Sequence, residues 1–82
     1  MTKATELLDN LRALVRDNDH FDLITRSEDV IRGHWLDLTP ADREELDELI
    51  SCEVDDAAAG PDGGKWLVVR GSLDAVMRET WD

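Results

Sequence analysis

The stretch LTPADREELDELISCEVDD, from Leu38 to Asp56, carries the clearest helix-start signals in the chain. Thr39 is placed to cap a helix, Pro40 suits its first position, and Asp42 follows three residues after the cap, as in a capping box. Apolar residues then recur at helical spacing: Leu46, Leu49, Ile50 and Val54. The pattern predicts an amphipathic helix that buries one narrow stripe and leaves its other faces polar.

The same stretch holds eight acidic residues against one base, Arg43. The helix dipole favours the acids of the first turn by about 0.3–1 kcal/mol each, but it disfavours those near the C-terminal end, and neighbouring like charges repel. The later acids therefore have a weak folding rationale, and a partner outside the helix explains them better. All the acids of the stretch are candidate partner-binding residues: Asp42, Glu44, Glu45, Asp47, Glu48, Glu53, Asp55 and Asp56.

The negative charge of the whole chain is segregated. Residues 17–62 hold fifteen acids and three bases, which gives -12, while residues 1–16 carry +1 and residues 63–82 carry zero, in agreement with the total of -11. A field of this sign repels nucleic acids and membrane surfaces and attracts basic partners. Adaptation to high salt is an alternative explanation, but it should spread acids along the whole chain, and both ends are balanced.

Length and composition indicate a single small acidic domain over residues 1–82. Apolar residues make up 41% of the chain, which is enough for one core, and no apolar run approaches the ~20 residues that span a bilayer. The N-terminus has no signal pattern, and the single Cys52 cannot form an internal disulfide. These features predict a cytoplasmic protein.

Two further helices are expected before Leu38. The first begins at the cap Thr2, ends near Asn18, and buries Ala4, Leu7, Leu8, Leu11, Leu14 and Val15. The second spans about 22–35, with an interruption at Arg26 and Ser27, where Ser27 could cap a shorter helix. Its expected apolar positions are Phe21, Ile24, Ile31 and Trp35. The segment FDLIT, residues 21–25, also alternates as a strand would, so helix and strand both stay open there.

Residues 65–71, KWLVVRG, are rich in aromatic and β-branched residues and follow a turn-rich loop, which predicts a strand near 65–70. Its pairing partner would be residues 51–54, residues 21–25 or a second copy of the chain, so 50–54 is also open between helix and strand. A last helix is expected from a cap at Ser72, with a buried stripe of Leu73, Val76, Met77 and Trp81. The predicted fold class is mainly α, with about four short helices and a short strand or hairpin near 65–70; the alternative is α+β.

A calcium loop is matched in part by residues 17–28. Asp17, Asp19 and Glu28 stand at its positions 1, 3 and 12. Phe21 stands where the loop needs an oxygen ligand, and Asp22 where it needs the glycine of the sharp turn. We therefore expect an acidic helix junction and no calcium.

Other chemical motifs are equally weak. His20 and His34 have no zinc-ligand spacing with each other or with Cys52, which we expect to be a small core residue. GPDGGK, residues 60–65, lacks the Lys-Ser/Thr pair and the following helix that a phosphate-binding loop requires. No metal, no cofactor and no enzymatic activity are expected.

The best interpretation of the segregated charge is a non-enzymatic acidic binding protein that presents a negative face to a basic partner protein. Its sharpest form is a DNA mimic that inhibits a nucleic-acid-binding enzyme. In size and charge the chain is similar to small acidic phage-encoded inhibitors of the anti-restriction and anti-CRISPR type. The alternatives are a small structural or regulatory homodimer with a solvated acidic face, and an antitoxin or immunity-type partner.

Overall fold

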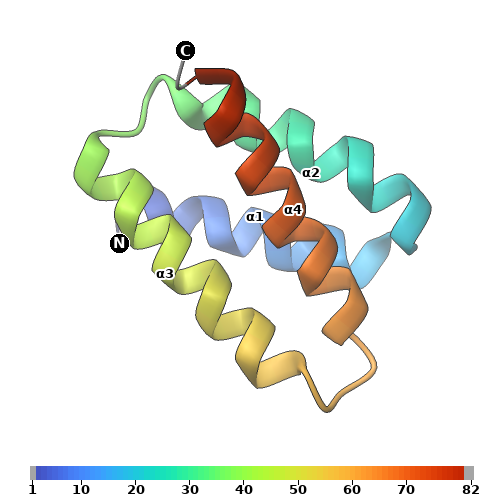
Figure 1. The fold of residues 1–82 in the computed structure, drawn as a ribbon. Coiled ribbons are helices and arrows are strands. Elements are labelled where there is room, and N and C mark those ends of the chain that lie inside the picture. The colour runs from blue at the N-terminus through green and yellow to red at the C-terminus, as the bar shows by residue number, and fades with distance from the viewer. Residues whose placement is uncertain (1, 81–82) are drawn as a thin grey trace.

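A computed structural model describes residues 2–80 of the chain, and this part is entirely helical (Figure 1). Its four helices are α1 (Lys3–Asp17), α2 (His20–Trp35), α3 (Pro40–Ala57) and α4 (Gly63–Thr80). Within residues 2–80 there is no strand. The prediction of a mainly α fold with about four helices is confirmed.

Helix α4 lies between α2 and α3, and α1 packs against the same two helices from the other side. The contacts of α2 with α4 run from His20 beside Gly64 at their first turns to the ion pair of Arg32 with Glu79 near their last turns. These two helices therefore run in the same direction, although 27 residues separate the end of one from the start of the other. Consecutive helices run in opposite directions (Figure 1).

The core draws on all four helices and on Leu38 in the short connection between α2 and α3. Helix α3 contributes least, because Leu46 and Ile50 are its only fully buried side chains, while Leu49 and Val54 are partly buried against the core. The narrow stripe predicted for this helix is confirmed. The buried apolar residues are Ala4, Leu7, Leu8, Leu11, Val15, Leu23, Ile31, Trp35, Leu38, Leu46, Ile50, Trp66, Val69, Leu73 and Val76.

The predicted helix boundaries at Thr2, Asn18 and Thr39 are confirmed. Thr2 Oγ1 accepts from the Thr5 amide at 3.2 Å, and Asn18 follows the last residue of α1. Thr39 Oγ1 accepts from the Asp42 amide at 3.1 Å, while Asp42 Oδ2 accepts from the Thr39 amide at 3.1 Å, which completes the capping box. Side chains thus satisfy amides that a helix start leaves without intrahelical partners.

The predicted strand near 65–70, and with it a hairpin or an α+β fold, is wrong. Residues 65–71 form the first half of α4. Trp66, Val69, Leu73 and Val76 are buried at spacings of three and four residues, whereas Leu67 is 59% exposed. This periodicity extends beyond the short β-branched window, and burial against α2 and α3 outweighs the weak strand preference of the valines.

The predicted interruption of α2 and the cap at Ser72 are also wrong. Ser27 and Ser72 are both buried inside their helices, and their Oγ atoms lie 2.6 Å apart. Ser27 Oγ also donates to the Leu23 carbonyl at 2.5 Å, the back-bonding that lets a serine stand inside a helix. Of the expected stripe after Ser72, Leu73 and Val76 are buried and Met77 is partly buried; Trp81 lies outside the described residues.

Both segments left open between helix and strand are helical. Residues 21–25 belong to α2 and residues 50–54 to α3. Ile31 and Trp35 are buried as expected, but Phe21 is 84% exposed and Ile24 is 48% exposed. The fully buried apolar positions of α2 are Leu23, Ile31 and Trp35, so two of the expected apolar positions, Phe21 and Ile24, were assigned to the wrong face.

The helical conformation of residues 65–71, which the sequence predicted as a strand, can be tested with two glycines of α4. Gly71 lies in the middle of the helix, and the methyl group of an alanine there would have nothing within 4 Å, whereas at Gly63 it would lie 2.8 Å from the Ala57 carbonyl oxygen. We expect Gly71→Ala to raise the free energy of unfolding by about 0.5–1 kcal/mol, since alanine is the better helix former. Gly63→Ala should lower it, because backbone must shift. Urea denaturation measures both, and a destabilised Gly71→Ala would contradict a helix at this position.

A bidentate ion pair joins the last turns of α2 and α4. Arg32 donates from Nε and Nη2 to the two carboxylate oxygens of Glu79, at 3.0 and 2.8 Å. These hydrogen bonds hold the pKa of Glu79 below its ordinary value of 4.5. A carboxylate whose pKa is lowered by folding contributes stability above its unfolded pKa and loses that contribution as the pH falls through the folded value.

We therefore expect Glu79→Gln to be less stable than the wild type at neutral pH and the difference to vanish as the pH falls below 4.5. Denaturation curves between neutral and acidic pH measure it. Glu48→Gln is the matched control, because Glu48 has no partner among the described residues. A stability difference for Glu79→Gln that is constant with pH would show that the ion pair contributes nothing.

Candidate functional site

All eight candidate acids lie on α3, and the structure divides them into two equal groups. Asp42 completes the capping box, Glu45 accepts from Thr2 Oγ1 at 3.0 Å, and Asp47 and Glu53 form ion pairs with other helices. The second group has no side-chain hydrogen bond or ion pair within residues 2–80 and is exposed: Glu44, Glu48, Asp55 and Asp56.

Arg70 connects α4 to α3 through Asp47. Its Nη1 donates to the Asp47 carboxylate and to Ser51 Oγ at 3.1 Å, and its Nη2 lies 3.2 Å from Asp74 on α4 itself. The guanidinium is thus shared between two carboxylates, and neither side chain of the Asp47–Arg70 pair is fully exposed. Asp47 therefore serves the packing of α4 on α3.

Arg12 makes the corresponding connection from α1. It donates to Glu53 Oε1 from Nε at 3.0 Å and from Nη2 at 2.5 Å, and Asp9 lies 3.2 Å from its Nη1. The hydrogen bonds to Glu53 raise the pKa of Arg12 above its ordinary value. Thr2, at the start of α1, contacts Glu45 in the first half of α3, and Arg12 contacts Glu53 further along both helices. The two helices α1 and α3 therefore run in the same direction. Sequence reasoning gave Asp47 and Glu53 a weak folding rationale, and the structure supplies one.

Three of the unpaired acids share one line along the helix. Glu44, Glu48 and Asp55 stand at i, i+4 and i+11, which at ~100° per residue places them within ~40° of one another and over ~16 Å of helix length. Opposite them on α3 are the buried Leu46 and Ile50. We call Glu44, Glu48 and Asp55 the outer acidic face. Asp56 is exposed as well, but it lies ~100° away from Asp55 around the helix.

The outer acidic face can accept hydrogen bonds without breaking any contact within the described part of the chain. Its carboxylates project from a helix that is capped at its start and held by ion pairs on both flanks, so their spacing is fixed before a partner arrives. Cys52 also lies on this side of α3 and is exposed, so the expectation that it belongs to the core is wrong. Arginine and lysine side chains are the donors that such a surface suits.

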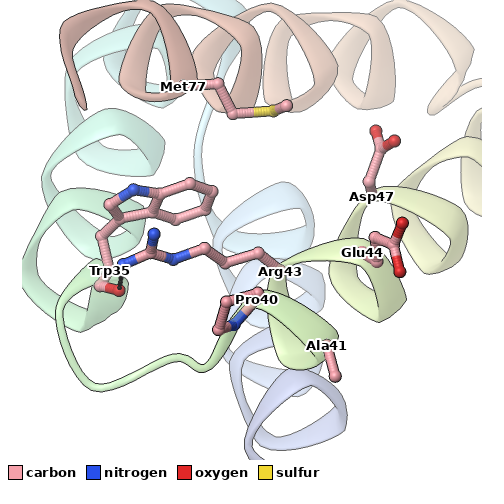
Figure 2. A pocket seen from close by; sticks show the side chains of 7 residues that line it. All are labelled: Trp35, Pro40, Ala41, Arg43, Glu44, Asp47 and Met77. Carbon is pink, nitrogen blue, oxygen red and sulfur yellow. Dashed lines mark hydrogen bonds between the residues drawn. The ribbon is translucent and has the colours of Figure 1, made fainter. Parts of the chain in front are cut away.

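A cavity of about 670 Å³ opens beside the first turns of α3, where the last turns of α2 and α4 meet them (Figure 2). Arg43 lies over the Trp35 ring at 4.5 Å from its centroid, and its Nη2 donates to the Trp35 carbonyl at 2.7 Å. Sequence reasoning missed this cavity, because its walls come from three helices. We call it the Trp35 pocket, lined by Trp35, Pro40, Ala41, Arg43, Glu44, Asp47 and Met77.

The described part of the chain has no cluster of possible metal ligands. Across residues 2–80 no group of three or more His, Cys, Asp or Glu side chains is placed to hold a metal ion. Asp19, from the partial calcium loop, caps α2 by accepting from the Asp22 amide at 2.9 Å. None of the helices, as far as they are described, is long and apolar enough to cross a membrane.

Comparisons with known proteins give no relative from which a function could be transferred. No protein-family model matches the chain, and neither the curated proteins nor the solved structures contain a match.

The division of the acids can be tested by removing single charges. Asp47→Asn and Glu53→Gln should each lower the free energy of unfolding by about 0.5–1 kcal/mol, because each removes the ion pair that joins α3 to a neighbouring helix. Glu48→Gln and Asp55→Asn should leave it unchanged or raise it slightly, since they remove only repulsion. Urea denaturation at low salt measures all four. Equal effects in the two groups would contradict the division.

Proposed function

We propose that this protein is a non-enzymatic binding protein whose outer acidic face engages a basic surface of a partner protein. The observation that carries the proposal is the shared line of Glu44, Glu48 and Asp55, exposed and without partners among the described residues. Other acids of α3 are used in folding, but these carboxylates repel one another and form no hydrogen bond or ion pair within residues 2–80. A partner with clustered arginines or lysines gives them a role.

The geometry also supports the finer proposal of a DNA mimic. Carboxylates one helical turn apart stand ~5–6 Å from each other, on the scale at which charges recur along a nucleic-acid strand. A groove rich in arginine that evolved for phosphates can take such a row of carboxylates. The proposed target is a nucleic-acid-binding enzyme, and the proposed effect is inhibition by occupying its nucleic-acid site. Direct binding of nucleic acid or membrane is not part of the proposal.

An antitoxin or immunity-type role would use the same face against a basic toxin. Competition with nucleic acid for the partner would distinguish a DNA mimic from such an antitoxin.

The homodimer alternative is based on a different observation. Phe21 is 84% exposed and Ile24 is 48% exposed on the first turns of α2, and apolar side chains of this size favour contact with another chain. Sedimentation of the wild type against Phe21→Ser tests that alternative. For either role we propose a cytoplasmic location, where the exposed Cys52 stays reduced.

Charge reversal on the outer acidic face is the decisive experiment. The variant Glu48→Lys with Asp55→Lys changes the net charge from -11 to -7, and Glu6→Lys with Asp37→Lys makes the same change on exposed side chains that are not part of α3. The wild type is used to capture its partner from the native host, and all three proteins are then titrated with it at two salt concentrations.

The outer-face variant should lose several kcal/mol of binding free energy, because two lysines would face the partner's bases. The control variant should stay close to the wild type, and wild-type affinity should fall with salt. For a DNA mimic, the enzyme's own nucleic acid should displace the protein. Equal losses in both variants would mean that net charge alone acts, and no loss in either would show that the face is solvated surface.

A further inference from the structure

We infer that the Trp35 pocket receives an apolar side chain of the same basic partner, with an arginine or lysine next to that side chain reaching Glu44. The inference rests on the proposed function and names the kind of segment that the surface takes: an aliphatic or aromatic residue flanked by bases. It extends the interface from the exposed side of α3 into the junction of three helices.

The walls of the pocket are suited to an apolar guest. Trp35 and Met77 form one side in Figure 2, and Pro40 and Ala41 lie below them at the first turn of α3. The volume of about 670 Å³ lies within the ~300–1,000 Å³ of common ligand pockets, so one side chain and adjoining backbone fit. An apolar guest would gain the burial that hydrophobic side chains obtain in a core.

The pocket is also held open by contacts that are already made. Arg43 is fixed between the Trp35 ring and the Trp35 carbonyl, so it cannot swing away without losing both. Asp47 is held by Arg70 on the opposite side. The capping box fixes the turn that carries Pro40 and Ala41. Little ordering is therefore required when a guest enters, and preorganisation of this kind favours affinity.

The charged residues that line the pocket determine which residues of the partner can flank the apolar side chain. Arg43 lies over the Trp35 ring and donates from Nη2 to the Trp35 carbonyl, while its buried Nε has no hydrogen-bond partner. Asp47 has Arg70, so Glu44 is the lining carboxylate without a partner in the described part of the chain. Glu44 is also the first member of the outer acidic face. A side chain seated in the pocket therefore places its flanking residues against Glu44, with Glu48 one turn further along α3, and bases are favoured there.

The outer acidic face and the Trp35 pocket would contribute to binding in different ways. Carboxylates on an exposed face steer a basic partner and are screened by salt, whereas a buried apolar anchor slows dissociation and is insensitive to salt. Interfaces concentrate their binding energy in such anchors, surrounded by polar contacts of lower value. The Trp35 pocket at the end of the outer acidic face has this arrangement.

Two tripeptides test the inference on the whole protein. The probes are acetyl-Arg-Leu-Arg amide and acetyl-Arg-Ser-Arg amide, which carry equal charge and differ in the apolar side chain. Ala41→Trp, at an exposed lining position, blocks the pocket, and Ala59→Trp, exposed in the loop before α4, is the matched control. Binding is followed by shifts of backbone amide signals in nuclear magnetic resonance titrations.

The leucine peptide should bind the wild type about tenfold more tightly than the serine peptide, as burial of a leucine side chain allows. Ala41→Trp should abolish that tenfold ratio and Ala59→Trp should keep it. The variant Glu48→Lys with Asp55→Lys should weaken both peptides and keep the ratio. The largest shifts on adding the leucine peptide should fall at Ala41, Glu44 and Met77.

The contrary outcomes separate the two proposals. Equal affinities of the two peptides for the wild type, or a ratio that Ala41→Trp leaves intact, would overturn the pocket inference and leave the outer acidic face standing. A ratio that is present while charge reversal has no effect would support the pocket and overturn the role of the face. Absence of binding by both peptides at millimolar concentration would count against both.

Discussion

Helix α3 is held in place by two arginines. Its apolar stripe is narrow, with Leu46 and Ile50 as its fully buried side chains, and a helix with so little buried surface packs weakly by hydrophobic contact alone. Arg12 from α1 and Arg70 from α4 bind Glu53 and Asp47 on its two flanks. The charge-balanced ends of the sequence therefore supply the bases that secure its acidic middle.

This arrangement decides which carboxylates remain available. The acids on the flanks of α3 are neutralised by neighbouring helices, and the acids on the side away from the core are left to solvent or to a partner. The outer acidic face is thus rigid because of the acids that are not part of it. A protein that presents fixed negative charge needs both paired acids, which hold the helix in place, and unpaired acids, which face the partner. The proposed interface therefore depends on the ion pairs as much as on Glu44, Glu48 and Asp55.

Local signals in the sequence carried most of the fold. The caps at Thr2 and Thr39 and the narrow stripe of α3 follow from neighbouring residues, and the structure confirms them. The strand near 65–70 failed because a window of β-branched residues was read without the longer period of Trp66, Val69 and Leu73. The ion pairs and the Trp35 pocket could not be predicted, since Arg12 and Glu53 stand 41 positions apart and only the packed helices bring them together.

The buried hydroxyls of Ser27 and Ser72 have a consequence for how α2 and α4 select their alignment. The two oxygens lie 2.6 Å apart, and Ser27 Oγ also donates to the Leu23 carbonyl of its own helix. A shift of one helix along the other by a single turn would leave Ser27 its bond to the Leu23 carbonyl but would separate Ser72 from its partners on α2. A buried polar group left unsatisfied costs about 1–3 kcal/mol. The pair adds little to overall stability, yet it discriminates against misaligned packings that the apolar residues alone would tolerate. Ser27 and Ser72 thus favour one alignment of α2 and α4, the two helices that share the most extensive contact in the fold.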